Sequence, residues 1–265
     1  MNIHSIKRPK KVLLVPDPHA HPDFNNDRAD WLGQYIKDER PDVVVNIGDT
    51  FDMPSLSSFD KGKASFSGAN YEKDINTGLD FLDRMWHPMR KTKKKKPYSV
   101  FCVGNHEQRL SRVLEQQPEL GGERYGIGWS NYGLDKYHDE VVPYVGITPS
   151  IWTLDSVDFA HFFVSGVMAK AIGGINHANT MLSKNHRSSV CGHSHMADFA
   201  VQTASQGSKI MSVVGGIYQD YDSVWAGNTC KLWWRGLVML NNLEGSTFDP
   251  EFVNLKSLER AYGKT

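Results

Sequence analysis

The chain has 265 residues, of which 40% are hydrophobic and 11% aromatic, enough to form a buried core. Lysine plus arginine and aspartate plus glutamate each total 30, which excludes binding of nucleic acids or membranes through a strong net charge. The three cysteines favour reduced thiols, and the N-terminal segment has no apolar stretch long enough for a signal peptide or a membrane span, so we expect a cytoplasmic protein.

Strands and helices alternate in the first half of the sequence. Apolar runs predict strands near 11–15, 43–47 and 99–103. Helical spacing predicts helices near 26–39, 71–89 and 107–115, with Pro88 marking the end of the second one. Residues 52–70 have the composition of a loop. This alternation predicts a mostly parallel sheet covered by helices.

Strand signals dominate the second half. Residues 118–150 lack clean periodicity, and we expect helical turns and loops that cover the site. Strands are then predicted at 151–154, 157–163, 189–191, 199–203, 209–214, 232–240 and 248–255, and one helix near 174–184. The whole pattern predicts an α/β fold in which two sheets pack face to face between helices, a four-layer α/β/β/α sandwich, in a single domain covering residues 1–265.

Potential metal ligands follow four of these strands. They are Asp17-Pro18-His19, Gly48-Asp49, Gly104-Asn105-His106-Glu107 and Gly192-His193-Ser194-His195. Because an unpaired buried charge is costly, convergence on metal ions explains these residues better than packing does. Asp17 and His19 are two residues apart, and so are His193 and His195. On an extended chain the two side chains of each pair point to the same side. Mixed carboxylate, imidazole and amide ligands suit Mn²⁺, Fe or Zn²⁺ better than Ca²⁺.

In this order, the motifs resemble the calcineurin-like metallophosphoesterase superfamily, whose pattern is D-x-H, G-D, G-N-H-[D/E], a single histidine and G-H-x-H. The resemblance covers residues 12 to about 200. It implies a two-sheet sandwich flanked by helices and a site for two divalent metal ions, with manganese expected first and iron, zinc or nickel as alternatives. It also implies that one ion is held by Asp17, His19 and His195. Asp49 then bridges to a second ion.

The resemblance implies that Asn105, His193 and a further histidine from the middle of the chain hold the second ion. His161 follows the predicted strand as the family pattern requires, but Phe162 stands where the family usually has glycine. The alternatives are His177 and His186, which lie in helical or loop context where an exposed imidazole is the usual case.

By the same resemblance His106 is not a metal ligand, but stabilises the phosphoryl charge or protonates the leaving oxygen. Asp52 is expected to orient His106, with a turn cap as the alternative role. Glu107 either fixes the Asn-His turn or begins the following helix. The implied reaction is in-line attack on phosphorus by a metal-bridging hydroxide.

The substrate is less well defined by the sequence. Protein serine/threonine phosphatases of the superfamily have an arginine where this chain has Met53-Pro54, whereas the Gly-Asp-x-Phe-Asp segment is shared with nucleases. The basic run 91–96 is expected to be a solvated loop opposite the site, and Tyr218, Tyr221 and Trp225 are candidates either to stack a base or to pack.

We therefore expect a metal-dependent phosphodiesterase acting on a nucleotide or nucleic-acid substrate, with no membrane partner. The alternatives are a phosphomonoesterase with the same site and a non-catalytic metal-binding scaffold. The sequence does not predict the oligomeric state.

Overall fold

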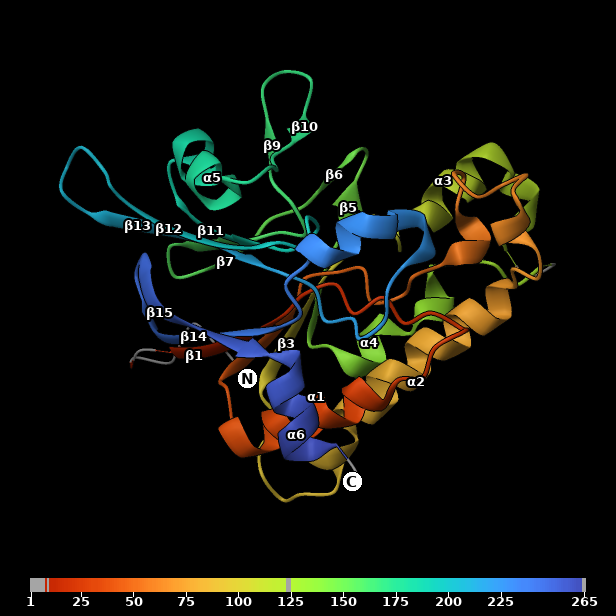
Figure 1. Ribbon diagram of the computed structural model, residues 1–265, viewed down its shortest axis with the longest axis horizontal. Coiled ribbons are helices and arrows are strands. Elements are labelled where there is room, and N and C mark those ends of the chain that lie inside the picture. The colour runs from red at the N-terminus through yellow and green to blue at the C-terminus, as the bar shows by residue number, and fades with distance from the viewer. Residues whose placement is uncertain (1–7, 9, 123–124, 264–265) are drawn as a thin grey trace.

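Two β-sheets lie face to face at the centre of the molecule in the computed structural model, which describes residue 8 and residues 10–122 and 125–263 (Figure 1). The first sheet has the order β15 (Thr247–Asn254), β14 (Gly236–Glu244), β1 (Lys10–Val15), β2 (Val43–Asn46), β3 (Tyr98–Cys102) and β4 (Glu140–Val142). The second has the order β12 (Ala197–Thr203), β13 (Lys209–Gly215), β11 (Ser188–Cys191), β8 (Val157–Phe159) and β7 (Trp152–Leu154).

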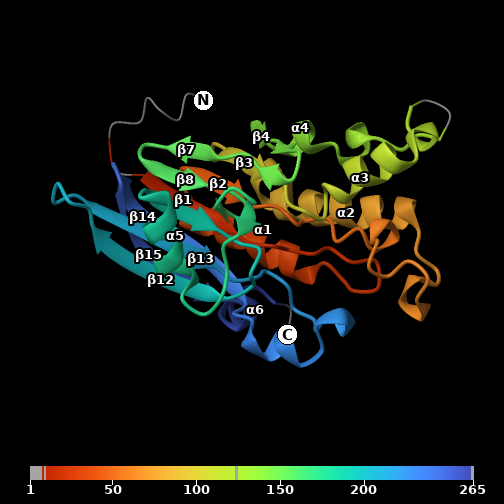
Figure 2. The same cartoon turned by 90° about the horizontal axis from the view of Figure 1, so that it is seen from above.

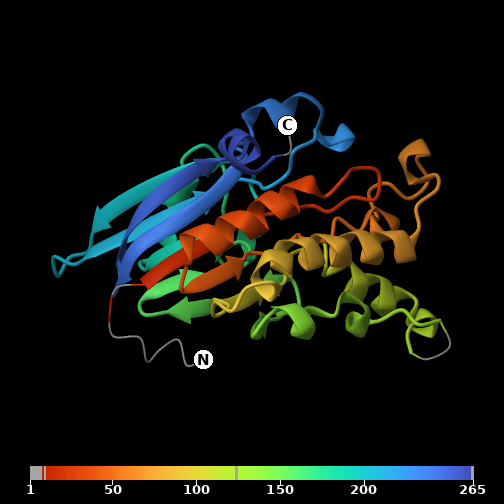
Figure 3. The same ribbon diagram turned by 90° about the horizontal axis from the view of Figure 1, so that it is seen from below.

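Helices cover the outer face of each sheet. The first sheet packs against α1 (Asp27–Glu39), α2 (Tyr71–Arg90) and α6 (Leu255–Tyr262), which lie in front of it in Figure 3. The second sheet is covered by α5 (His177–Asn185), as Figure 2 shows from the other side. These layers confirm the predicted α/β/β/α sandwich.

The alternation of side chains along β1 explains how one strand serves two apolar cores. Val12 and Leu14 face the second sheet and are buried with Phe159. Leu13 and Val15 face the opposite way and are buried against helices α1 and α2. A strand buried on both faces needs the continuous apolar run that this sequence has.

The central strands bring their carboxyl ends to a common edge. Strands β1, β2, β3 and β4 are parallel to one another, and Val15 pairs with Asn46, which in turn pairs with Phe101. In the second sheet β8, β11 and β13 are also parallel. Loops after parallel strands meet at one edge of a sheet, which is where ligands bind in such folds.

The remaining elements are short and join these layers. They are α3 (Arg109–Gln116), α4 (Leu134–Tyr137), the hairpins β5 (Tyr144–Val145) with β6 (Thr148–Pro149) and β9 (Val164–Ser165) with β10 (Lys170–Ala171), and the 3₁₀ helices η2 (Pro54–Leu56), η3 (Ala64–Phe66), η4 (Pro118–Leu120), η5 (Trp129–Tyr132) and η6 (Val224–Leu232). No helix among the described residues is long and apolar enough to cross a membrane. The basic run 91–96 lies between α2 and β3, at the strand ends opposite the site, as predicted.

Several predicted boundaries were wrong. The last predicted strand ends at Asn254 and is followed by α6, and the strand expected at 232–240 begins at Gly236. Strand β4 falls in a region expected to be irregular. Pro88 does not end α2, which continues to Arg90. Instead its ring packs where α1 and α2 cross, since a Cβ added at Gly33 would lie 2.9 Å from Pro88 Cδ.

The two ends of the described chain share one sheet. Strand β14 pairs with β1 antiparallel, and β15 completes the same edge. This arrangement supports our proposal that the chain forms a single domain.

Candidate active site

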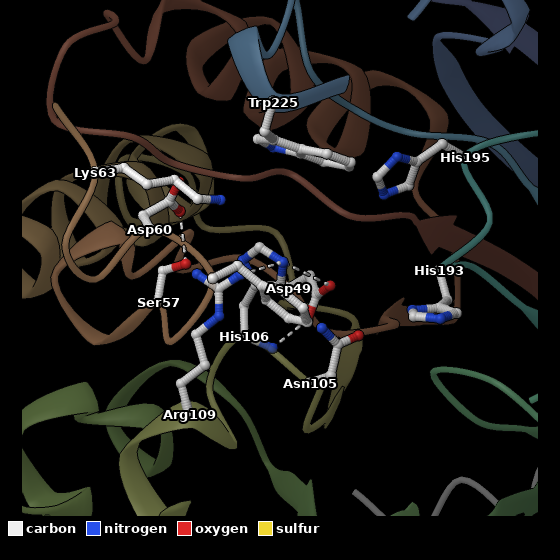
Figure 4. A pocket seen from close by; sticks show the side chains of 11 residues that line it. Asp49, Ser57, Asp60, Lys63, Asn105, His106, Arg109, His193, His195 and Trp225 are labelled. Atoms are coloured by element: carbon white, nitrogen blue, oxygen red, sulfur yellow. Dashed lines mark hydrogen bonds and ion pairs between the residues drawn. The ribbon is translucent and has the colours of Figure 1, made fainter. Parts of the chain in front are cut away.

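The predicted site residues lie at the common strand edge. Asp17 and His19 follow β1, Asp49 follows β2, and Asn105 follows β3. The second sheet contributes His161 after β8, and His193 and His195 after β11. Figure 4 shows Asp49, Asn105, His106, His193 and His195 turned toward one cavity. Residues up to 178 positions apart in sequence, from Asp17 to His195, are thus brought together by the sandwich.

The backbone of this edge is unusual, because five non-glycine site residues have positive φ. The angles are 41° at Asp17, 43° at His19, 51° at Asp49, 65° at His193 and 61° at His195. Such conformations are uncommon for residues with a Cβ and occur where the surrounding structure imposes them, often at functional sites.

A first group of ligand atoms surrounds the His161 ring. Its Nε2 lies 2.9 Å from Asn105 Oδ1, 3.3 Å from Asp49 Oδ2 and 3.2 Å from His193 Nδ1. Its Nδ1 donates a hydrogen bond to the Ile47 carbonyl oxygen at 2.8 Å, which leaves Nε2 facing the other three groups. Asp49, His161 and His193 offer ligand atoms that all lie within 4.8 Å of one another.

The electrostatics of this first group suit a cation. Burial opposes the charge on His161, but the Asp49 carboxylate raises the pKa of this imidazole to about 9. Burial and the neighbouring His161 lower the pKa of His193 to about 3, so His193 is a neutral imidazole with a lone pair to offer. A divalent cation can take the place of the His161 Nε2 proton, since both present positive charge to the same acceptors.

A second group lies around Asp17, His19 and His195. The Nε2 atoms of the two histidines are 3.4 Å apart, and Asp17 Oδ2 lies 3.6 Å from His195 Nε2. Two nitrogens bound at about 2.1 Å to one tetrahedral ion are also about 3.4 Å apart. Asp17 Oδ1 is buried and has no hydrogen-bond partner within the described chain, and burial raises the pKa of Asp17 to about 7. A buried carboxylate oxygen that lacks a hydrogen-bond donor in this way fits a metal ligand.

Asp52 holds two imidazoles in place. Its Oδ1 accepts a hydrogen bond from His19 Nδ1 at 2.8 Å, while His106 Nδ1 lies 2.7 Å from the Asp52 carbonyl oxygen and 3.0 Å from Oδ1. Burial opposes the charge on Asp52, but the hydrogen bonds from His106 and His19 hold the pKa of this carboxyl well below its usual value. Sequence reasoning paired Asp52 with His106 alone, whereas in the structure it also orients His19.

Glu107 resolves the alternative left open by the sequence, because it precedes α3 and fixes the turns. Its Oε2 accepts from the backbone N–H groups of Asp49 and Gly104, and its Oε1 accepts from that of Phe51, each at 3.0 Å. The loops after β2 and β3 are therefore held together by one buried carboxylate.

These strand-end loops agree with the outcome of sequence comparison. The sequence model of the calcineurin-like phosphoesterases matches residues 10–238. The chain belongs to this family. No curated protein matches the sequence. The match runs from β1 into β14 and so includes every predicted site residue. As a calcineurin-like phosphoesterase the protein is a metal-dependent phosphoric ester hydrolase, in a family that typically binds two divalent metal ions.

The site of this phosphoesterase opens into a cavity of about 460 Å³ (Figure 4). Its walls include residues that the sequence analysis did not single out, namely Ser57, Phe59, Asp60, Lys63 and Arg109. Most of them come from the loop between β2 and α2, which carries no motif that marks it as part of the site.

Arg109 is the most informative of the missed residues. Its Nη1 donates to the carbonyl oxygens of Asp52 at 2.8 Å and Met53 at 3.1 Å, and its Nη2 lies 3.1 Å from His106 Nε2. Burial and the Arg109 charge lower the pKa of His106. The spacing of three residues from His106, at the start of a predicted helix, was the available signal.

The alternative middle histidines of the phosphoesterase lie elsewhere. His177 is buried rather than exposed, and its Nδ1 lies 3.0 Å from Ser194 Oγ, while His186 is exposed at the end of α5. Of the candidates for base stacking, Tyr218 is fully buried and donates to the Arg28 carbonyl oxygen, so that role was wrong for Tyr218. Tyr221 stacks on Phe24, and Trp225 lines the cavity.

Proposed function

We propose that this phosphoesterase is a phosphodiesterase that acts on a nucleotide or nucleic-acid substrate. The observation that carries the proposal is that the site has a cavity on each of two sides. One, of about 460 Å³, extends toward Lys63 and Trp225, and a second, of about 630 Å³, extends toward Arg112 and Tyr144. A phosphodiester has a substituent on each side of phosphorus, whereas a monoester has only one.

Trp225 supports a nucleoside as one of these substituents. Its side chain is 65% exposed although it belongs to a wall of the first cavity, and it lies across that cavity from Arg109 in Figure 4. An exposed tryptophan beside a phosphate site offers a flat apolar face on which a base can stack.

For the metal ions we propose the arrangement implied by the family motifs. Asp17, His19 and His195 would hold one ion, Asn105, His161 and His193 would hold the other, and Asp49 would serve both. Burial opposes the charge on Asp49, but His161 and His106 hold the pKa of this carboxyl well below its usual value, so it is ionised. We expect manganese as the metal. Two divalent ions would supply a more acidic water and neutralise charge on the phosphate oxygens.

The chain's own residues then have separate tasks. Arg109 is proposed to bind a non-bridging phosphate oxygen, since its guanidinium is held in the cavity wall by two carbonyl oxygens. His106 Nδ1 donates a hydrogen bond to the Asp52 carbonyl oxygen at 2.7 Å, and its Nε2 lies 3.1 Å from Arg109 Nη2. When the Arg109 Nη2 group moves from Nε2 to a bound phosphate, its charge no longer opposes protonation of His106, so Nε2 can take up a proton from water and pass it to the leaving oxygen.

The proposal is tested by comparing hydrolysis of bis-p-nitrophenyl phosphate and p-nitrophenyl phosphate in Mn²⁺. We expect the diester to be cleaved faster, and Asp49→Asn to abolish both activities. Asp135→Asn, which changes an exposed aspartate on α4, is the matched control. Faster monoester cleavage would overturn the diesterase proposal and leave the metal site standing. Metal binding without hydrolysis of either ester in Mn²⁺, Zn²⁺ or Ni²⁺ would favour a scaffold.

A further inference from the structure

The second cavity is continuous with the proposed catalytic site. Its volume is about 630 Å³, and it shares Phe59, Asn105, Arg109 and His193 with the first cavity. Asn105, Arg109 and His193, which Figure 4 labels among the residues that line the first cavity, also line the second. A ligand bound at the phosphate site can therefore extend into the second cavity without leaving the protein surface.

The charge of the second cavity suits a further phosphate. Arg109 and Arg112 are three residues apart on α3 and so lie on the same side of that helix. Arg112 is exposed, and its Nη2 donates to the carbonyl oxygen of Asn105 at 3.1 Å, which anchors the guanidinium beside the metal-site motif. Glu115 is the only acidic side chain among the described residues that line this cavity.

Aromatic side chains line the same cavity. Phe59 is 77% exposed at the border of the two cavities, so the face of its ring is accessible to a ligand. The Phe162 ring lies 4.7 Å from the His193 ring and 6.1 Å from that of Tyr144. Phe162 is the residue at which the chain departs from the family's histidine-glycine pattern, so this wall is a feature of this chain.

Gln108 adds a polar group that is not satisfied by the protein. Its side chain lines the second cavity, only 9% of the residue is exposed, and Oε1 has no hydrogen-bond partner in the described part of the chain. A buried amide oxygen without a partner is costly, which favours a ligand that supplies a hydrogen-bond donor.

From these observations we propose that the second cavity is a binding site for the adjacent nucleotide of a single-stranded oligonucleotide. Arg112 binds the phosphate next to the one that is cleaved, and Phe59 stacks on the neighbouring base. Gln108 forms hydrogen bonds with the edge of that base. The inference rests on the proposed phosphodiesterase function and narrows its substrate to a chain with more than one phosphate, because a mononucleotide or a cyclic nucleotide would leave this cavity empty.

The test measures binding of fluorescein-labelled tetrathymidylate with phosphorothioate linkages, which slow cleavage, to the Mn²⁺-loaded protein by fluorescence anisotropy. Arg112→Gln removes the charge while keeping a donor for the Asn105 carbonyl oxygen. We expect it to weaken binding about tenfold and to reduce the slope of log K against log salt by about 0.7, the value for one phosphate contact on a single strand. Arg260→Gln, on α6, is the matched control.

Phe59→Ala provides a second, uncharged perturbation. It is expected to weaken binding of tetrathymidylate about tenfold while leaving the salt slope unchanged, because stacking releases no counterions. In hydrolysis assays, both variants are expected to lose more activity on unmodified tetrathymidylate than on bis-p-nitrophenyl phosphate, which is too small to fill both cavities.

The outcomes separate this inference from the proposed function. Equal affinities of Arg112→Gln and Arg260→Gln for tetrathymidylate would overturn the second nucleotide site, as would equally tight binding of thymidine monophosphate and tetrathymidylate to the wild type. If the wild type hydrolyses bis-p-nitrophenyl phosphate but neither binds nor cleaves tetrathymidylate, both the nucleic-acid substrate and the second site are refuted, while the diesterase activity stands. If tetrathymidylate binds in a way that depends on Arg112 but no ester is cleaved, the proposed diesterase activity is refuted instead.

Discussion

Adding a single methyl group at Gly104 tests the proposed bridging role of Asp49 without changing any ligand. A Cβ at Gly104 would lie 2.2 Å from Asp49 Oδ1 and 2.5 Å from the Asp49 backbone nitrogen. The φ angle of Gly104 is outside the left-handed region, so the clash and not the backbone conformation determines the effect. Gly104→Ala therefore forces the Asp49 carboxylate away from its present position.

The size of the effect follows from the distances. Ordinary contacts of a Cβ begin at 3.4 Å, so the carboxylate has to move by roughly 1 Å. A misplacement of that size can lower a reaction rate about 100-fold, and disturbing a ligand's position typically lowers metal affinity about 10- to 100-fold. The overpacked turn should also cost about 1–3 kcal/mol of folding free energy.

The assay combines calorimetric titration with Mn²⁺, hydrolysis of bis-p-nitrophenyl phosphate, and thermal unfolding to show that the variant folds. Gly128→Ala is the control, because the nearest atom to an added Cβ there is Ser130 Oγ at 3.9 Å. Gly192→Ala tests the other ion independently, since its Cβ would lie 2.7 Å from Asp17 Oδ1. If folded Gly104→Ala binds Mn²⁺ and turns over substrate like Gly128→Ala, the proposed position of the metal ions is wrong.

Two further predictions concern histidines with different roles. His106→Asn should lower kcat about 10²- to 10⁴-fold, while the stoichiometry of Mn²⁺ binding is retained. The loss should be larger for a substrate with an alkyl leaving group than for one with a p-nitrophenyl leaving group. Equal losses on the two substrates would argue against proton transfer to the leaving oxygen. His138 is buried, and neither ring nitrogen has a hydrogen-bond partner among the residues that the structure describes. Burial and nearby Lys96 lower its pKa to about 3. Because its folded pKa is depressed, the stability it contributes is present above pH 6.5 and is lost as pH falls, by about 2 kcal/mol between pH 6.5 and 5. His138→Phe should flatten this part of the curve of unfolding free energy against pH, and an unchanged slope would show that His138 does not cause it.

The fold could be predicted because the strands of both sheets are short apolar runs that end in polar motifs. The apolar run of β1 and the D-x-H and H-x-H pairs are local signals. They can be recognised in the sequence without knowledge of the tertiary structure. Strand β4 could not be predicted in this way, since its three residues, Glu140 to Val142, are too few to show a period and form a strand by pairing with β3.

Helix α6 was missed although its signals were present. Asn254 accepts a hydrogen bond from the Lys256 backbone as an N-cap, and Leu255 and Leu258 are buried against α1. The predicted strand was extended across the cap because Phe252 and Val253 are apolar and adjacent to it. The cap residue Asn254 is the sequence signal that marks the boundary between β15 and α6.

The residues of the candidate site likewise fall into those that the sequence predicts and those that it does not. Residues within motifs, such as Asp49 and Asn105, could be placed from sequence because the motif and the strand end coincide. Phe59 and Lys63 could not, because they reach the cavity only through the path of the loop between β2 and α2. No local property of that loop determines where it lies, and only the packed structure does.

The left-handed backbone at Asp17, His19, Asp49, His193 and His195 has a consequence for how this protein can change. Each such residue costs on the order of 1 kcal/mol relative to glycine, which adopts the conformation freely. Variants selected only for heat resistance in the presence of a chelator should therefore acquire glycine or asparagine at these positions. Selection with metal present should keep the original residues, because ion binding then stabilises the folded state. The proposed metal ligands are thus retained only where metal binding or activity offsets the cost of their backbone conformation.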